Sequence, residues 1–149
     1  GTECMAGFVI DAVTGQRKAL LQYGAGYEWS PNKKFVSAYN YSGQYGITVG
    51  DKKEKVLLSI KREHDLNDSK RLDWETRAMW SPDSQKLALI IKKESEEKME
   101  LLTFDAQNNF KQIFQTDIEY SREYELFWSN DSKKMNWGNL NIVFRDNSR

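Results

Sequence analysis

Apolar residues occur along the chain in short runs separated by polar turns, without the spacing of an amphipathic helix. Runs such as 35–41, 87–91 and 101–104 are rich in β-branched, aromatic or Leu residues, and Gly, Asn, Asp and Ser cluster between the runs. Runs of this length and composition predict strands. We count about 13 of them at the spacing of an antiparallel meander, and so predict an all-β fold.

The individual runs also indicate where each strand lies in its sheet. Residues 87–91 form the longest fully apolar run, and a strand that is apolar on both faces is typical of one covered by a sheet on each side. Residues 55–59 mix apolar and charged side chains, which favours an edge strand with one face near water. No run is long enough to span a bilayer, so no transmembrane segment is expected.

A tetrapeptide recurs three times within this pattern. Its copies begin at Trp29, Trp80 and Trp128, 51 and 48 residues apart, and read Trp-Ser-Pro-Asn, Trp-Ser-Pro-Asp and Trp-Ser-Asn-Asp. A short, partly apolar stretch precedes each Trp, and further apolar runs follow it. This spacing is that of stacked four-stranded β units. It divides a single domain, 1–149, into a partial unit 5–23, complete units 27–60 and 77–116, and a partial unit 124–146.

The tetrapeptide has good turn chemistry. Pro presets the backbone of a type I turn, and Ser and Asp side chains bond nearby backbone amides. The Trp before the turn supplies a large apolar surface, so we expect it to pack between neighbouring sheets rather than to line a ligand site. The residues to which we assign this structural role are Trp29, Pro31, Trp80, Pro82, Asp83, Trp128 and Asp131.

The repeat resembles that of the TolB-type β-propeller family, whose hallmark is Trp-Ser-Pro-Asp-Gly followed by a Lys and an apolar strand. The resemblance covers most of the chain and implies propeller blades, an extracytoplasmic setting (secreted, periplasmic or lipid-anchored) and protein partners. Lys33, Ser84 and Ser132 stand where the family has Gly, and Asn130 replaces Pro. Gly relieves a left-handed backbone, so we expect differently shaped turns. The first turn is also expected to be one residue shorter than the others.

The number of repeats raises the question of closure, because propellers close with about four to eight blades and this chain supplies about three. An open arc of three or so small sheets is the favoured arrangement. Completion of a ring by a homodimer comes second, and the chain could also be part of a longer protein. A β-sandwich that reuses the turn motif is the alternative fold.

Composition excludes several classes of function. Lys plus Arg and Asp plus Glu are both 22, so no basic excess argues for nucleic acid.

Cys4 is the only cysteine, which rules out an intramolecular disulfide. We interpret it as an ordinary thiol near the terminus, with a lipid-bearing lipoprotein cysteine as the alternative. A signal peptide could have been removed before Gly1.

Loops after the second and fourth strands of each unit emerge at one edge, which brings together 41–46, 61–76, 92–98 and 115–123. The second of these is the longest, and long loops are often functional. Trp74 is expected to tuck beneath that loop as an anchor, whereas an exposed Trp would indicate a contact surface. Alternating Tyr residues near 41–46 suggest a stacking platform for sugars or peptides, although cross-strand packing explains them more simply.

No catalytic or metal-binding motif is complete. His64 is the only histidine, and Asp65 beside it suggests a general base, but a surface residue is expected because no Gly-x-Ser-x-Gly elbow exists. Asp65-x-Asn67-x-Ser69 has the spacing of a calcium loop. Lys70 then occupies the position that needs Gly, so no metal and no cofactor is expected.

We therefore predict a non-enzymatic module that presents loops to a protein, peptide or glycan. The candidate binding residues are Tyr41, Tyr45, His64, Asp65, Arg71, Trp74 and Tyr120. One alternative is an accessory propeller-like domain of a larger hydrolase or peptidase. Another is a hydrolase or lyase that acts through the carboxylates of the long loop, Asp65, Asp68, Asp73 or Glu75.

Overall fold

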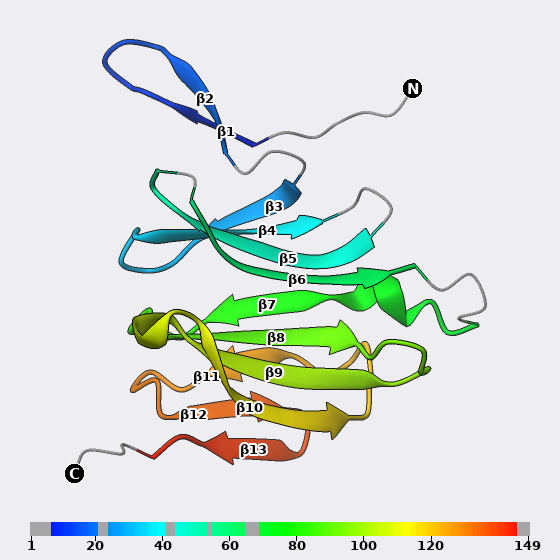
Figure 1. Ribbon diagram of the computed structural model, residues 1–149. Coiled ribbons are helices and arrows are strands. Elements are labelled where there is room, and N and C mark those ends of the chain that lie inside the picture. The colour runs from blue at the N-terminus through cyan, green and yellow to red at the C-terminus, as the bar shows by residue number, and fades with distance from the viewer. Residues whose placement is uncertain (1–6, 21–23, 41–43, 54, 65–68, 146–149) are drawn as a thin grey trace.

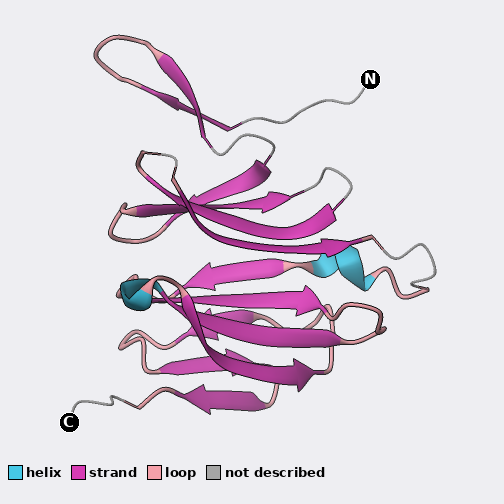
Figure 2. Ribbon diagram, viewed as in Figure 1, coloured by secondary structure: helices cyan, strands magenta, loops and turns pink. Residues whose placement is uncertain are grey.

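The computed structural model describes residues 7–20, 24–40, 44–53, 55–64 and 69–145. In these residues the chain forms antiparallel sheets and two short 3-10 turns (Figures 1 and 2). An N-terminal hairpin pairs β1 (Gly7–Ile10) with β2 (Arg17–Leu20). Neither 3-10 turn is long enough to cross a membrane. The prediction of an all-β fold is confirmed.

Three further sheets follow in chain order. The first sheet holds β3 (Gly24–Trp29), β4 (Phe35–Asn40), β5 (Gln44–Asp51) and β6 (Val56–Glu63). The second sheet holds β7 (Arg77–Trp80), β8 (Lys86–Lys92), β9 (Met99–Asp105) and β10 (Lys111–Ile118). The third sheet holds β11 (Leu126–Trp128), β12 (Lys134–Trp137) and β13 (Leu140–Val143). The 3-10 turns are η1 (Leu72–Glu75), before β7, and η2 (Ala106–Asn108), after β9.

Each of these sheets is a meander in which every strand pairs with the next along the chain. The sheets lie one after another as layers, with the N-terminal hairpin at one end and the third sheet at the other (Figure 1). No ladder joins the third sheet to the hairpin in the described part of the chain. The arrangement is therefore the predicted open series of propeller-like sheets.

The core is divided by β8, as its fully apolar sequence predicts. Leu87, Leu89 and Ile91 belong to the cluster shared with the first sheet, whereas Ala88 and Ile90 belong to the cluster shared with the third. All five are fully buried. Burying one large aliphatic side chain contributes about 1.5–3 kcal/mol, so this strand holds the three layers together.

The repeated tryptophans occupy equivalent positions, each at the last residue of the first strand of its sheet. The indole Nε1–H of Trp80 donates to Ser37 Oγ at 3.3 Å, and that hydroxyl donates to the carbonyl of Glu28 at 3.2 Å. Trp128 Nε1–H donates directly to the carbonyl of Met79 at 3.1 Å. The second and third Trp thus each dock on the preceding sheet.

The three tetrapeptide turns have the same length, so the expectation of a shorter first turn is wrong. Trp29 pairs with Val36, just as Trp80 pairs with Leu87, seven residues later in both cases. Phe35 therefore corresponds to Lys86 and not to Leu87. The apolar Phe35 made the second strand seem to begin one residue early.

The residue that follows each tetrapeptide has a left-handed backbone, the conformation for which Gly is the usual residue. Lys33, Ser84 and Ser132 have φ angles of 62°, 63° and 61°. The two serines are buried, and each hydroxyl accepts a hydrogen bond from the preceding turn. Asn32 N–H donates to Ser84 Oγ at 2.8 Å, and Asp83 N–H donates to Ser132 Oγ at 2.9 Å. Serine therefore keeps the left-handed turn and adds a bond between sheets.

Strands take up part of the predicted loops. β5 begins at Gln44, β6 extends to Glu63 and β10 extends to Ile118, so 44–46, 61–63 and 115–118 belong to strands. These segments carry polar side chains on their exposed face, which resembled loop sequence. The connections between strands are correspondingly shorter than the sequence suggested.

Candidate binding site at the loop edge

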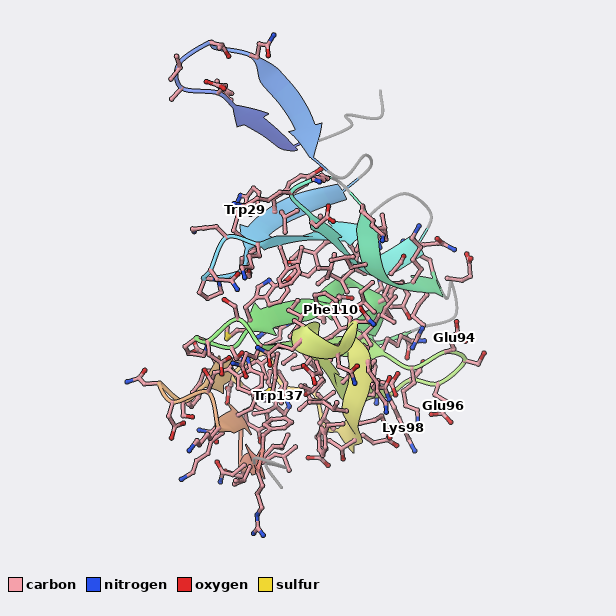
Figure 3. All side chains as sticks on the ribbon, turned by 60° about the vertical axis from the view of Figure 1, so that its left-hand side comes forward. Trp29, Glu94, Glu96, Lys98, Phe110 and Trp137 are labelled. Carbon is pink, nitrogen blue, oxygen red and sulfur yellow. The ribbon has the colours of Figure 1, made fainter. Side chains whose placement is uncertain are left out.

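The ends of β4, β6, β8 and β10 lie at one edge of the layers, opposite the tetrapeptide turns (Figure 1). This edge carries His64, η1, the β8–β9 loop and the segment that follows β10. Glu94, Glu96 and Lys98 project outward from the β8–β9 loop (Figure 3), and all three are exposed. That loop is therefore a mixed-charge hairpin with an exposed tip, whereas the partly buried pair His64–Asp73 lies at η1.

A histidine and a buried aspartate form the centre of this edge. His64 Nδ1 lies 2.8 Å from Asp73 Oδ2, and Asp73 is only 5% exposed. Because a carboxylate accepts, the imidazole donates through Nδ1. The His64 ring lies between Tyr45, at 5.5 Å between centroids, and Trp74, at 5.7 Å. The carboxylate that orients the imidazole is thus Asp73, whereas Asp65, the predicted partner, lies outside the described residues.

Trp74 is 64% exposed, so the expectation that it is a buried anchor is wrong. Its neighbour in η1, Leu72, is buried in the core cluster between the second and third sheets. With Leu72 and Asp73 turned inward, the next side chain of the short turn faces solvent. The indole therefore forms an exposed aromatic surface beside His64.

A small cavity of about 40 Å³ lies beneath this aromatic surface. The lining residues that matter most to its chemistry are Asn40, Tyr45, His64, Asp73, Trp74 and Thr76. Three of them carry a buried polar atom without a hydrogen-bond partner, namely Asn40 Nδ2, Asp73 Oδ1 and Thr76 Oγ1. Each such atom costs about 1–3 kcal/mol when it is left unpaired. Their gathering around one cavity indicates a place for a polar group.

A second network lies beside the first and joins the second and third sheets. Arg77 donates through Nη2 to Tyr120 Oη at 3.1 Å and through Nη1 to the carbonyl of Tyr124 at 3.2 Å. Tyr120 donates in turn to the Glu75 carboxylate. Burial and then this hydrogen bond raise the pKa of Tyr120 above its ordinary value. The Arg77 guanidinium also lies over the ring of Trp137, 5.8 Å from its centroid.

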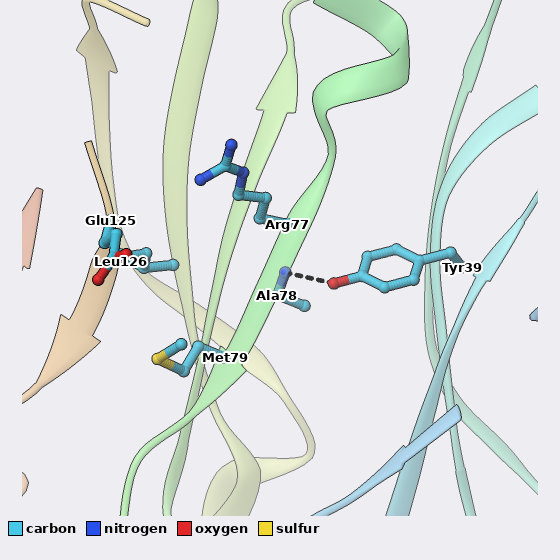
Figure 4. Close-up of a pocket in the computed structure, with 6 residues that line it drawn as sticks. All are labelled: Tyr39, Arg77, Ala78, Met79, Glu125 and Leu126. Carbon is cyan, nitrogen blue, oxygen red and sulfur yellow. Dashed lines mark hydrogen bonds between the residues drawn. The ribbon is translucent and has the colours of Figure 1, made fainter. Parts of the chain in front are cut away.

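A larger cavity of about 280 Å³ opens between these sheets and the first sheet (Figure 4). It is lined by Tyr39 of the first sheet, Arg77, Ala78 and Met79 of β7, and Glu125 and Leu126 at β11. Tyr39 Oη accepts a hydrogen bond from Ala78 N–H at 3.0 Å and so bridges the first two sheets. The lining charges, Arg77 and Glu125, are of opposite sign. Sequence reasoning missed both, because Arg77 is only the first residue of β7 and Glu125 only precedes β11.

The structure brings together some of the predicted binding residues and separates others. Tyr45, His64 and Trp74 form one aromatic group, although Tyr45 is buried. Arg71 is exposed next to η1 with a left-handed φ of 54°, and Tyr120 belongs to the separate Arg77 network. The remaining binding candidates, Tyr41 and Asp65, lie outside the described residues, as does Asp68 of the hydrolase alternative.

Two of the carboxylates proposed for a hydrolase, Asp73 and Glu75, are among the described residues, and they have different partners. Asp73 faces His64, whereas Glu75 accepts from Tyr120 and from Arg122 Nε at 3.3 Å. Among the described residues, no group of three or more His, Cys, Asp or Glu side chains is placed to hold a metal ion. Asp73 and Glu75 therefore belong to two separate hydrogen-bond networks.

Comparison of the sequence with models of known protein families finds no match. Comparison with curated proteins finds no relative either. The similarities found are therefore to solved structures, through the fold.

Solved structures show the same fold at low sequence identity. The β-propeller domain of the Trilobed protease from Pyrococcus furiosus, described as having an open velcro topology, matches 87% of the chain with a TM-score of 0.60 and 18% identity. The acylaminoacyl peptidase of Pyrococcus horikoshii matches 86% with a TM-score of 0.58 and 15% identity. The hydrazine synthase of Kuenenia stuttgartiensis matches 87% with a TM-score of 0.56 and 16% identity.

The chain spans only part of each of these proteins, 38%, 22% and 36% of their respective lengths. At this level of identity the likeness establishes the fold, which is part of a β-propeller, and carries no activity across.

Proposed function

We propose that this chain is a non-enzymatic binding module that presents the edge around η1 to a protein, peptide or glycan partner. The observation that supports this most directly is Trp74, whose indole is 64% exposed and lies against His64 beside a polar cavity. Exposed Trp side chains are enriched where proteins bind partners, because they offer a large and rigid contact surface.

The layered sheets provide a suitable support for such a site. Leu72 anchors η1 in the core between the second and third sheets, and Asp73 fixes the His64 ring. The aromatic surface is thus held by packed strands on both sides, which reduces the entropy lost on binding.

A second candidate is an accessory propeller-like region of a larger hydrolase or peptidase. It is supported by the likeness to a protease β-propeller domain and to an acylaminoacyl peptidase, of which the chain spans less than half. The Trp-Ser-Pro-Asp repeat additionally favours a TolB-type propeller with an extracytoplasmic location. A reading frame that encodes a hydrolase segment on the same polypeptide supports this candidate, and one without such a segment opposes it.

Arrays of peptides and of glycans test the binding function. The wild type is compared with Trp74→Ala and with Phe127→Ala, which removes another exposed aromatic, 48% exposed, from the third sheet. We expect ligands that bind the wild type and Phe127→Ala but not Trp74→Ala. Equal binding by all three proteins, or no ligand on either array, contradicts the proposal.

A further inference from the structure

The unpaired atoms around the smaller cavity specify the chemistry of its occupant. Asp73 Oδ1 can only accept when the carboxylate is ionised, whereas Asn40 Nδ2 can only donate. The orientation of the Asn40 amide is set by Thr48, whose hydroxyl donates to Asn40 Oδ1 at 3.0 Å. Thr76 Oγ1 can do both. A single group that satisfies this set must donate and accept at the same site.

This requirement excludes several ligands. An ammonium group only donates and leaves Asn40 unpaired, and a carboxylate or phosphate only accepts and is repelled by Asp73. The cavity of about 40 Å³ exceeds the roughly 10–15 Å³ that one water-sized group needs by the same measure, so it has room for a group of a few atoms. A hydroxyl group fits both the chemistry and the size, whether it belongs to a ligand or to a water molecule that a ligand hydroxyl would displace.

The surroundings indicate which hydroxyl compound binds. The Trp74 indole lies beside the cavity with 64% of its surface exposed, and its ring is tilted by 33° from that of His64. An exposed aromatic face beside a hydroxyl site suits the C–H face of a sugar ring. A peptide could use the Trp74 surface, but only a Ser, Thr or Tyr side chain would supply the hydroxyl.

We propose that this edge binds a neutral pyranose sugar, with one hydroxyl paired to Asn40, Asp73 and Thr76 and the ring lying on Trp74. This inference rests on the proposed binding function and specifies its ligand class. The repeated hydroxyls of a glycan supply the required group at every residue, which favours it over a peptide.

The decisive variants are Thr76→Val and Thr103→Val. Both remove a buried hydroxyl that has no hydrogen-bond partner, at nearly constant shape, but Thr103 is not among the residues that line the cavity. Both variants should fold, and their melting temperatures should equal or exceed that of the wild type, because no hydrogen bond is lost. Only Thr76→Val removes a group that the sugar uses.

The probes are the methyl glycosides of glucose, mannose and galactose, titrated into ¹⁵N-labelled protein while the Trp74 indole N–H resonance is followed. We expect at least one glycoside to shift this resonance, with affinity lowered about five-fold in Thr76→Val and unchanged in Thr103→Val. Trp74→Ala should lower the affinity for the same glycoside about ten-fold, as measured by saturation-transfer NMR on the sugar.

The inference is overturned if none of the glycosides shifts the Trp74 resonance, or if Thr76→Val binds as the wild type does. A peptide that shifts Trp74 when no glycoside does overturns the sugar assignment and leaves the proposed function standing. If neither peptides nor glycosides bind, both fail.

Discussion

The backbone N–H of Asp83 donates a hydrogen bond to the hydroxyl of Ser132, at 2.9 Å, and so joins the turns of the second and third sheets. The equivalent bond from Asn32 to Ser84 joins the first and second sheets at 2.8 Å. In both turns the serine adopts the left-handed backbone for which Gly is the usual residue. The strain of that backbone is therefore accompanied by a bond that Gly cannot make.

Ser132→Ala should destabilise the fold. The variant keeps the strained backbone but removes the acceptor of the partly buried hydrogen bond from Asp83 N–H, which costs about 0.5–1.5 kcal/mol. Chemical denaturation monitored by Trp fluorescence measures the change. Ser121→Ala is a control in the segment after β10, where the Ser121 hydroxyl accepts a local bond from Glu123 N–H. Equal stability of Ser132→Ala and the wild type contradicts a role for the bond between sheets.

Lys33→Gly should have the opposite effect. Lys33 has the same left-handed φ of 62°, but it is exposed and its turn is the first of the series. Gly removes the backbone strain but makes the unfolded chain more flexible. The net effect should be a rise of about 0.5–1 kcal/mol in the free energy of unfolding. The same denaturation experiment measures it. Loss of stability in this variant means that the Lys33 side chain has a structural role.

The third turn should respond to pH through Asp131. The hydroxyl of Ser129 and then the backbone N–H of Lys133 hold the pKa of Asp131 below its ordinary value of 3.8. A carboxyl whose pKa is lower in the folded state contributes stability above pH 3.8, and this is lost as the pH falls through the lowered pKa.

Ser129→Ala should therefore raise the pKa of Asp131 toward 3.8, measured by ¹³C NMR titration of the side-chain carboxyl. The pKa of Asp117, which is lowered mainly by Lys93, provides an internal reference because Ser129 is not among its causes. If the pKa of Asp131 and the pKa of Asp117 are both unchanged in Ser129→Ala, the Ser129 hydroxyl is not the main cause of the lowered pKa of Asp131.

Leu89→Ala should be strongly destabilising. Leu89 is fully buried in the cluster shared by the first and second sheets, and such a cavity costs about 2–5 kcal/mol. Ile113→Ala is the matched surface control, since Ile113 is 42% exposed on β10. If both changes cost the same, β8 does not hold the layers together as described.

The sheets could be predicted because their signals are local. Trp80, the turn and the following strand are adjacent in sequence, so their spacing alone located the layers. The apolar run at 87–91 likewise indicated a strand covered on both faces, and β8 has that position. The backbone shape of the turns was harder to predict, because Ser84 and Ser132 replace Gly through bonds to a different sheet.

The site could be predicted only in part. His64 and Trp74 were identified as unusual residues of a long loop, but their relation depends on η1, which places Asp73 against His64 across nine residues. No periodic pattern signals a single 3-10 turn. The three unpaired polar atoms come from β4, from η1 and from the residue after it, so only the packed structure brings them together.

Mapping of a ligand by ¹H–¹⁵N NMR tests the central claim, that the edge around η1 is the binding surface. The peptide or glycan with the strongest array signal is titrated into labelled wild-type protein. We predict that the largest shifts occur at His64, Trp74 and Thr76, with the amides of the opposite turns, Lys33, Ser84 and Ser132, unaffected. Shifts confined to those turns, or to the outer face of the third sheet at Phe127, contradict the account.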